Sequence, residues 1–341
     1  MTGKRPEEGA EPFALAGDIG GTHTRLSLLS SEGRVRRRAV LDSRRYPSLE
    51  AAVEDFLRAT APRPKIKAAA FGVAGPVVGG RCATTNLPWV VDEKVLARRL
   101  AIPDVTLLND LVALALGAVR VRGSKLHRLG TAAAPRRRGA NVAVLAAGTG
   151  LGEAVLVWDG ARFVPCATEG GHADFAPRDD LETELLAFLR RRFGHVSFER
   201  VLSGDGLGCL YEFFLQAKGM REGPDSARVI EAAADRNAAI AQLGTSGKSK
   251  PAARATELFA SIYGAEAGNL ALKSLAVGGV YVCGSIAVGL LPVLARGGFR
   301  RAFVDKGRLG PFLEQIPVAV VLDTDVGLAG AAGVALAAAT Q

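Results

Sequence analysis

Apolar and polar residues alternate near the start of the chain with the period of two that is typical of half-buried strands. The clearest case is residues 22–30, where Thr24, Leu26 and Leu28 alternate with polar neighbours. Further along, a period near 3.6 indicates helices whose apolar side chains share one face. The pattern predicts strands at 13–17, 22–30, 34–41, 66–73 and 105–108, and helices that begin after Ser48, Asp92 and Asn109.

The same order of elements begins again near residue 141. The pattern predicts strands at 141–147, 152–158, 162–165, 280–283 and 317–322, and helices near 180–193, 206–218, 254–276 and 327–339. Residues 221–251 are polar and interrupted by Gly, Pro and Ser, which predicts a surface helix and a mobile loop.

A strand, a glycine turn, two further strands and then helices therefore occur twice, as a repeat of architecture rather than of sequence. This repeat predicts two α/β domains with a cleft between them. We expect a smaller domain at 13–120 and a larger one at 139–341, whose last helix is free to pack back on the first domain. Residues 1–12 are expected to form a flexible tail.

Composition supports a two-domain protein with a large core, because the chain has 341 residues, of which 48% are hydrophobic and 23% charged. No apolar stretch reaches the roughly twenty residues that span a membrane. The polar segment Met1–Pro12 has no apolar signal core, so we expect no export and a cytoplasmic location. Cys82, Cys166, Cys209 and Cys283 lie far apart and are expected to be reduced thiols, mostly buried.

The net charge of +9 raises the question of nucleic-acid binding. However, the basic runs are scattered along the chain and are not interleaved with aromatic residues. Solvated surface arginines explain them better than a nucleic-acid interface, and a positive field would also suit an anionic substrate.

Two glycine-rich turns each follow an apolar strand: Gly17-Asp18-Ile19-Gly20-Gly21-Thr22 and Gly148-Thr149-Gly150-Leu151-Gly152. Glycine permits positive φ and lets backbone N–H groups approach an anion closely. Two such turns, more than a hundred residues apart, predict two half-molecules that bind one polyphosphate. Neither turn is a Walker A loop, and neither opens a helix as a dinucleotide-binding turn does.

Asp18 places an acid beside the backbone donors of the first turn. A carboxylate there suits Mg²⁺ held mainly by phosphates, with Asp18 acting through water. A tight hairpin capped by Asp18 is the alternative interpretation of the same residues.

Eight ordered segments resemble bacterial glucokinases of the hexokinase–actin–Hsp70 superfamily, in the group distinct from the zinc-bearing branch. The segments are 17–22, Thr85-Asn86-Leu87-Pro88-Trp89, Leu108-Asn109-Asp110, 148–152, Glu169-Gly170-Gly171-His172, Arg200-Val201-Leu202-Ser203-Gly204, Gly268-Asn269-Leu270-Ala271-Leu272 and Phe303-Val304-Asp305-Lys306-Gly307-Arg308. The resemblance implies two actin-like (ribonuclease H-like) α/β domains with an interdomain cleft, and ATP and Mg²⁺ as cofactors.

By resemblance, Asp110 is the catalytic base that faces the sugar 6-hydroxyl, beside Asn109. An aspartate is far too weak a base to form a free alkoxide. It can orient the hydroxyl and accept the proton late, as the new oxygen–phosphorus bond forms. Asn109-Asp110 also suits an ordinary helix N-cap, and both interpretations can hold together.

The resemblance also assigns Glu169, His172 and Glu199 to the sugar hydroxyls, with Asn86 as a weaker candidate. A wrong epimer would leave a buried acceptor unpaired, at a cost of about 1–3 kcal/mol. The zinc-bearing branch follows its histidine with a CxCGxxGC cluster that this chain lacks, so His172 is read as a hydrogen-bonding ligand. The other three histidines, His195 among them, have no comparable partners in the sequence.

Gly284 is assigned to the adenosine, with Ser285 in place of a common glycine. His23 also replaces a usual asparagine. The implied reaction is ATP-dependent phosphorylation of D-glucose to glucose 6-phosphate.

Two alternatives stay open. One is the same chemistry on mannose, fructose or an amino sugar, because loops set the fit around a shared site. The other is a sugar-sensing regulator without catalysis, for which the sixteen residues before Gly17 are too few to hold a DNA-binding domain. Relatives are often homodimers, and the Ala/Gly-rich helices could pack within or between chains.

Overall fold

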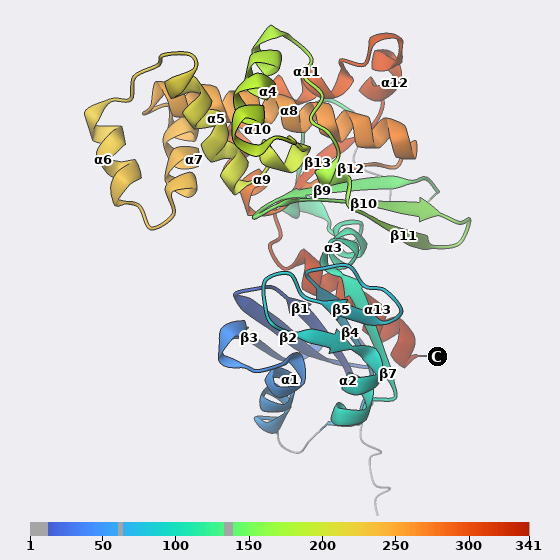
Figure 1. Cartoon of the computed structure of the whole chain (residues 1–341). Helices are drawn as coiled ribbons and strands as arrows, with labels where there is room; N and C mark the ends of the chain where they lie inside the picture. The colour runs from blue at the N-terminus through green and yellow to red at the C-terminus, as the bar shows by residue number, and fades with distance from the viewer. Residues whose placement is uncertain (1–12, 61–63, 133–138, 341) are drawn as a thin grey trace, which may run out of the picture. The chain divides into compact units, whose positions relative to one another are not determined.

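A computed structural model describes residues 13–60, 64–132 and 139–340, so the predicted tail at 1–12 lies outside the described residues. The chain divides into two compact units (Figure 1). The first contains residues up to Arg120 together with those from Asp325 onward, and the second is Val121–Thr324. The second unit thus begins earlier than the predicted 139, and the residues from Asp325 onward belong to the first unit.

The first unit is built on a five-stranded sheet of order β3-β2-β1-β4-β7. Strands β1, β4 and β7 run parallel, whereas β1, β2 and β3 form an antiparallel meander. The elements are β1 (Phe13–Ile19), β2 (His23–Ser30), β3 (Val35–Asp42), α1 (Leu49–Arg58), β4 (Ile66–Val73), β5 (Arg81–Ala83), β6 (Val90–Asp92), α2 (Glu93–Leu100), β7 (Asp104–Asn109), α3 (Asp110–Ala118) and α13 (Val326–Ala339).

Alternate residues of β1 face two different helical layers. Leu15 and Ile19 join the large apolar core beneath α1 and α2. Ala14 and Ala16 face α13, which covers the opposite side of the sheet with small residues. A Cβ atom on Gly330 of α13 would lie 1.7 Å from the carbonyl oxygen of Ala113 in α3. The sheet is therefore sandwiched between helices, and the α3–α13 contact requires glycine.

The second unit is built on a six-stranded sheet of order β11-β10-β9-β12-β13-β8, in which β9, β12 and β13 run parallel. Its strands are β8 (Leu126–Arg128), β9 (Val142–Ala147), β10 (Leu151–Trp158), β11 (Phe163–Thr168), β12 (Gly279–Cys283) and β13 (Val318–Val321). Its helices are α4 (Asp180–Phe193), α5 (Gly204–Gln216), α6 (Pro224–Ala232), α7 (Arg236–Ser246), α8 (Lys250–Ser274), α9 (Ser285–Gly289), α10 (Leu291–Leu294), α11 (Gly298–Val304) and α12 (Gly310–Glu314). No helix in the described part of the chain has the length and apolarity needed to cross a membrane.

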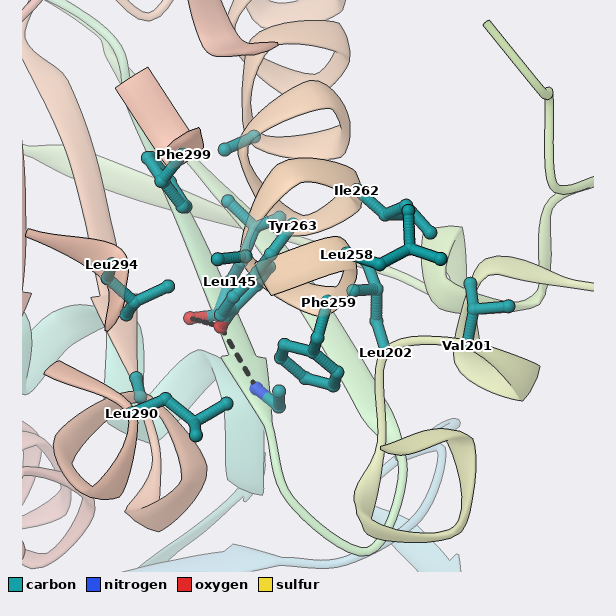
Figure 2. Packing of buried hydrophobic residues seen from close by; sticks show 14 of the residues in the cluster. Leu145, Val201, Leu202, Leu258, Phe259, Ile262, Tyr263, Leu290, Leu294 and Phe299 are labelled. Carbon is teal, nitrogen blue, oxygen red and sulfur yellow. Dashed lines mark hydrogen bonds between the residues drawn. The ribbon is translucent and has the colours of Figure 1, made fainter. Parts of the chain in front are cut away.

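The long helix α8 anchors the end of β9 through a fully buried tyrosine (Figure 2). The Tyr263 hydroxyl accepts a hydrogen bond from the Ala147 amide at 3.1 Å and donates to the Leu145 carbonyl at 3.4 Å. The rings of Phe259 and Phe299 pack edge-on against Tyr263. Because Ala147 directly precedes the second glycine turn, this core fixes where that turn begins.

Residues 221–251 differ from the sequence prediction of a surface helix and a mobile loop. They form α6, α7 and the first residues of α8. The Glu222 carboxylate accepts hydrogen bonds from the Tyr211 hydroxyl at 2.9 Å and the Ser249 hydroxyl at 2.5 Å. One acid thus holds both ends of the α6–α7 segment against α5, so the predicted mobile loop is wrong.

Candidate active site

The turn in the first glycine-rich segment is shorter than the sequence predicts. Gly17, Asp18 and Ile19 lie within β1, and only Gly20–Thr22 form the turn, which closes when the Gly20 amide donates to the His23 carbonyl at 3.0 Å. Ile19 is buried in the core. Gly17 and Ile19 are therefore parts of the sheet rather than of a turn, and their assignment to the nucleotide stays a prediction.

None of the glycines in the two glycine-rich segments is among the described glycines with positive φ, so the freedom to adopt positive φ does not explain them. Lack of space for a side chain explains two glycines of the first segment. A Cβ atom on Gly17 would lie 2.5 Å from Cδ1 of Phe71, and one on Gly21 would lie 2.5 Å from Cβ of Asn86. Asn86 thus packs directly against the first turn.

Asp18 faces the start of α13, where a Cβ atom on Gly327 would lie 3.6 Å from its carboxyl carbon. Burial raises the pKa of Asp18, although Arg25, at 3.3 Å, lowers it. Its side chain keeps 24% exposure and can reach water. Among the described residues, no group of three or more His, Cys, Asp or Glu side chains could hold a metal ion. Asp18 therefore fits Mg²⁺ only as a single acid that supplements phosphate oxygens.

The carboxyl ends of β1, β4 and β7 meet at one edge of the first sheet, because Ile19 pairs with Val73 and Val73 pairs with Asn109. Ligands commonly bind at this edge of parallel sheets. The structure therefore gathers the first turn, Asn86, Asn109 and Asp110 at the same edge.

Asn109 caps α3 with its side-chain oxygen and contacts a neighbouring loop with its side-chain nitrogen. Its Oδ1 accepts from the amides of Leu111 at 2.9 Å and Val112 at 3.3 Å, and its Nδ2 donates to the Gly75 carbonyl at 3.1 Å. Asp110 begins α3, is half-buried, and accepts from the Leu111 amide at 2.9 Å. The N-cap interpretation holds for Asn109, and this capping fixes the place of the Asp110 carboxylate.

Backbone hydrogen bonds within the second turn and from the start of α5 stabilise it. The Gly148 amide donates to the Gly150 carbonyl at 2.8 Å, and the Gly148 carbonyl accepts from the Gly204 amide at 2.9 Å. A Cβ atom on Gly148 would meet no atom within 4 Å, whereas one on Gly150 would lie 2.3 Å from Oε2 of Glu199. Gly148 therefore borders open space, whereas the absence of a side chain at Gly150 makes room for the Glu199 carboxylate.

Three of the predicted sugar-binding residues, Glu169, His172 and Glu199, lie around this turn. Glu169 precedes the 3₁₀ turn Gly170–His172, and a Cβ atom on Gly171 would lie 2.0 Å from the Leu151 carbonyl. Oε1 of Glu199 lies 3.9 Å from Nδ1 of His172. The structure brings His172 and Glu199 together and places the exposed Glu169 at the start of the same turn.

His195, which the sequence set apart from the candidate site, lies at the surface with Nε2 2.7 Å from Oδ1 of Asp174. Both side chains are largely exposed, so the pair adds little stability and lies outside the candidate set.

A cavity of about 750 Å³ opens beside the second turn. Gly148 and Thr149 line it together with Ser285 at the start of α9. Gly284, at φ 94°, brings this edge close, because its Cβ would lie 2.5 Å from the Ala147 carbonyl. Sequence reasoning missed the polar lining from α5 and α7: Asp205, Asp235, Asn237, Gln242, Thr245 and Ser246.

The motif that ends at Ser203-Gly204 could have pointed to Asp205. The Ser203 hydroxyl caps α5 by accepting from the Gly206 amide at 3.0 Å, and Asp205 then accepts from Nδ2 of Asn237 at 3.1 Å. No comparable signal marked α7.

Comparisons with known proteins show which family the chain resembles as a whole. A sequence profile of the Glucokinase family matches residues 15–338. A glucokinase of Nostoc sp. is 40% identical over 335 residues, which cover 93% of this chain and 97% of that protein.

Solved structures show the same fold. A glucokinase from an Antarctic psychrotroph superposes with a TM-score of 0.80 at 27% identity, covering 96% of this chain and 99% of that chain. Glucokinase from Balamuthia mandrillaris, solved in complex with glucose, gives a TM-score of 0.79 at 22% identity, covering 97% of this chain and 95% of that chain. The chain belongs to the Glucokinase family and has its two-domain α/β sugar-kinase fold.

Proposed function

We propose that this protein transfers the γ-phosphoryl group of ATP to the 6-hydroxyl of D-glucose, with Asp110 as the base. Membership of the Glucokinase family supports the reaction. The observation that carries the role of Asp110 is its position as the first residue of α3, at the sheet edge shared with the first turn and Asn86.

Asp110 acts as an orienting group and a late base. Its Oδ1 already accepts from the Leu111 amide, which fixes the direction of the carboxylate. A carboxylate has two oxygens with several acceptor positions, so Asp110 can also accept a hydrogen bond from the sugar hydroxyl. Phosphoryl transfer has a loose transition state, so positioning contributes most and the proton moves to the carboxylate as the new bond forms.

The sugar hydroxyls are assigned to Glu169, His172 and Glu199. The Glu199 carboxylate can accept from a hydroxyl, and His172 beside it can donate or accept according to its tautomer. Both are set by the glycine-rich backbone at the start of β10. An epimer that left either group unpaired would bind more weakly.

The nucleotide is assigned to the cavity beside Gly148, Thr149 and Ser285, whose volume of about 750 Å³ is that of a small-molecule site. Asp18 would hold Mg²⁺ through water, and the ion would neutralise phosphate charge when bound. Asp110 belongs to the first unit and this cavity to the second.

The deciding experiment is a coupled assay of ADP release with saturating MgATP over glucose, mannose, fructose and glucosamine. We expect glucose to give the highest kcat/KM. A higher value for another sugar would reassign the acceptor but keep the chemistry. No sugar-dependent ADP release at all would refute the proposed function.

A further inference from the structure

Two buried glutamates lie beneath the loop that carries Glu169 and His172. Glu153 of β10 is 2% exposed and Glu266 of α8 is fully buried. Each has an Oε1 atom with no hydrogen-bond partner among the described residues. Because buried polar atoms are nearly always paired, these two oxygens require an explanation.

Glu153 directly contacts the loop that carries Glu169 and His172. A Cβ atom on Gly170 would lie 2.2 Å from Oε2 of Glu153, so the carboxyl group touches the loop backbone. The Gly170 amide donates to the Thr168 hydroxyl at 3.1 Å, and that hydroxyl donates to the Glu153 carbonyl at 3.1 Å. The start of the loop is therefore held by both the backbone carbonyl and the side-chain carboxyl group of Glu153.

Glu266 is connected by hydrogen bonds to two of the segments that resemble glucokinases, 268–272 and 303–308. Oε2 of Glu266 accepts from Nδ2 of Asn269 at 2.8 Å, and Oδ1 of Asn269 accepts from Nζ of Lys306 at 2.6 Å. Nζ of Lys273 lies 3.8 Å from Oε1 of Glu266. The segments 268–272 and 303–308 thus converge on the buried acid pair.

We propose that Glu153 and Glu266 share one proton and act as positioning residues that hold Gly170, and with it Glu169 and His172, in the sugar-binding arrangement. The inference rests on the proposed function, which assigns this loop to glucose. Protonated Glu153 is the donor and Glu266 the acceptor, so neither group is left as an unpaired buried charge.

The surrounding charges agree with a shared proton. Burial, and next the charge of Glu266, raise the pKa of Glu153 to about 8, while Lys273 lowers it. Burial also raises the pKa of Glu266, and Asn269, Lys273 and Lys306 lower it.

The other titratable groups nearby do not supply this proton. Tyr263 lies on α8 and Cys283 on β12, and burial raises the pKa of both above the physiological range. Burial lowers the pKa of Lys306, and the charge of Arg178 lowers it further, whereas Glu182, Asp305 and Glu266 raise it. Loss of the shared proton above neutral pH would leave two negative charges beneath Gly170, and these charges would displace the loop.

The test is the pH profile of KM for glucose. Wild type should lose affinity above neutrality, with KM rising about tenfold between pH 7 and pH 9, because the protonated fraction falls tenfold per unit above the pKa. Glu153→Gln carries a permanent donor of similar shape, so its KM should stay flat over this range. Glu153→Ala should have a raised KM at every pH. Glu50→Gln, a buried glutamate on α1, is the matched control and should follow wild type.

A second measurement needs no catalysis. For an acid whose pKa is raised by folding, stability is present at low pH and is lost as pH rises from about 4.5 through about 8. The free energy of unfolding of wild type should therefore decline across this window relative to Glu153→Gln and Glu266→Gln. Identical slopes in wild type and both variants would overturn the shared proton.

The two measurements also separate this inference from the proposed function. Sloping stability without any glucose-dependent ADP release would refute the function and leave the proton pair standing. Normal glucose kinetics with the same KM profile in wild type and Glu153→Gln would refute the positioning role.

Discussion

The Glu199 carboxylate accepts a hydrogen bond from the Leu151 amide at 3.1 Å. Leu151 directly follows the second glycine turn, and the other carboxylate oxygen of Glu199 lies 3.9 Å from Nδ1 of His172. One side chain thus connects the turn that borders the nucleotide cavity with the loop assigned to the sugar. Its charge and its backbone contact can be separated by mutation.

Glu199→Gln should keep the acceptor for Leu151 and lose the charge toward His172 and the sugar. We expect KM for glucose to rise by roughly 10-fold to 100-fold, the loss of one charge-assisted hydrogen bond, with the melting temperature little changed. Glu199→Ala should also leave the Leu151 amide unpaired and cost about 1–2 kcal/mol of stability. Equal stability losses in Glu199→Gln and Glu199→Ala would contradict the view that the hydrogen bond to Leu151, and not the charge, supplies the stability.

The glycines of the two segments should respond oppositely to alanine. Gly148→Ala has open space and an ordinary φ, so the protein should stay stable. The added methyl group would occupy the cavity, and KM for ATP should rise several-fold with KM for glucose unchanged. Gly17→Ala meets Phe71 instead and should destabilise the fold by about 1–3 kcal/mol through overpacking.

Thermal unfolding and steady-state kinetics of these two variants check both statements. Gly223→Ala, an exposed glycine with free space outside the cavity, is the control for Gly148. An unstable Gly148→Ala, or a stable Gly17→Ala, would show that the packing argument fails.

Asp110→Asn should keep the cap of α3, because Asn109 supplies it, and lose the base. We expect kcat to fall by about 10² to 10⁴, the usual contribution of a general base. Glucose affinity, measured by calorimetry, should change little. Asp104→Asn, on the exposed opposite end of β7, is the matched control and should retain wild-type kcat. Wild-type turnover in Asp110→Asn would remove this residue from the mechanism.

Asp18 is expected to show a conflict between stability and activity. Burial raises its pKa, so the stability contributed by the protonated form is present below pH 3.8 and is lost as pH rises through the folded-state value. Asp18→Asn should therefore be at least as stable as wild type at pH 7, and the difference should vanish at low pH. Turnover should fall roughly hundredfold with the loss of the acid at the phosphates. Denaturant titrations at several pH values, with assays at pH 7, measure both.

Local signals predicted many of the individual elements. The predicted helix at 180–193 coincides with α4, because Asp179 caps it by accepting from the Glu182 amide and Gly194 ends it with φ 71°. The predicted strand at 66–73 coincides with β4. Helix caps and apolar periodicity involve residues that are close in the sequence, so they can be predicted from a single sequence.

Features that depend on distant segments were not predictable in this way. Helix α7 lines the cavity because it packs against α5 and α8. The sequences of these helices do not indicate that packing. The role of Gly17 depends on Phe71, a neighbour on the adjacent strand. Glu153 was recoverable in principle, because it shares the alternation of Leu151 and Val155, which face the core.

The place of α13 in the first unit has a consequence for how the protein is made. Its residues 326–339 cover Ala14, Ala16 and Ala70, yet they leave the ribosome only after the whole of Val121–Thr324. Domains generally fold as units during synthesis. The second unit can therefore complete its core first, while the sheet that begins the sequence waits with one apolar face uncovered. The part of the protein translated earliest is the last to be finished.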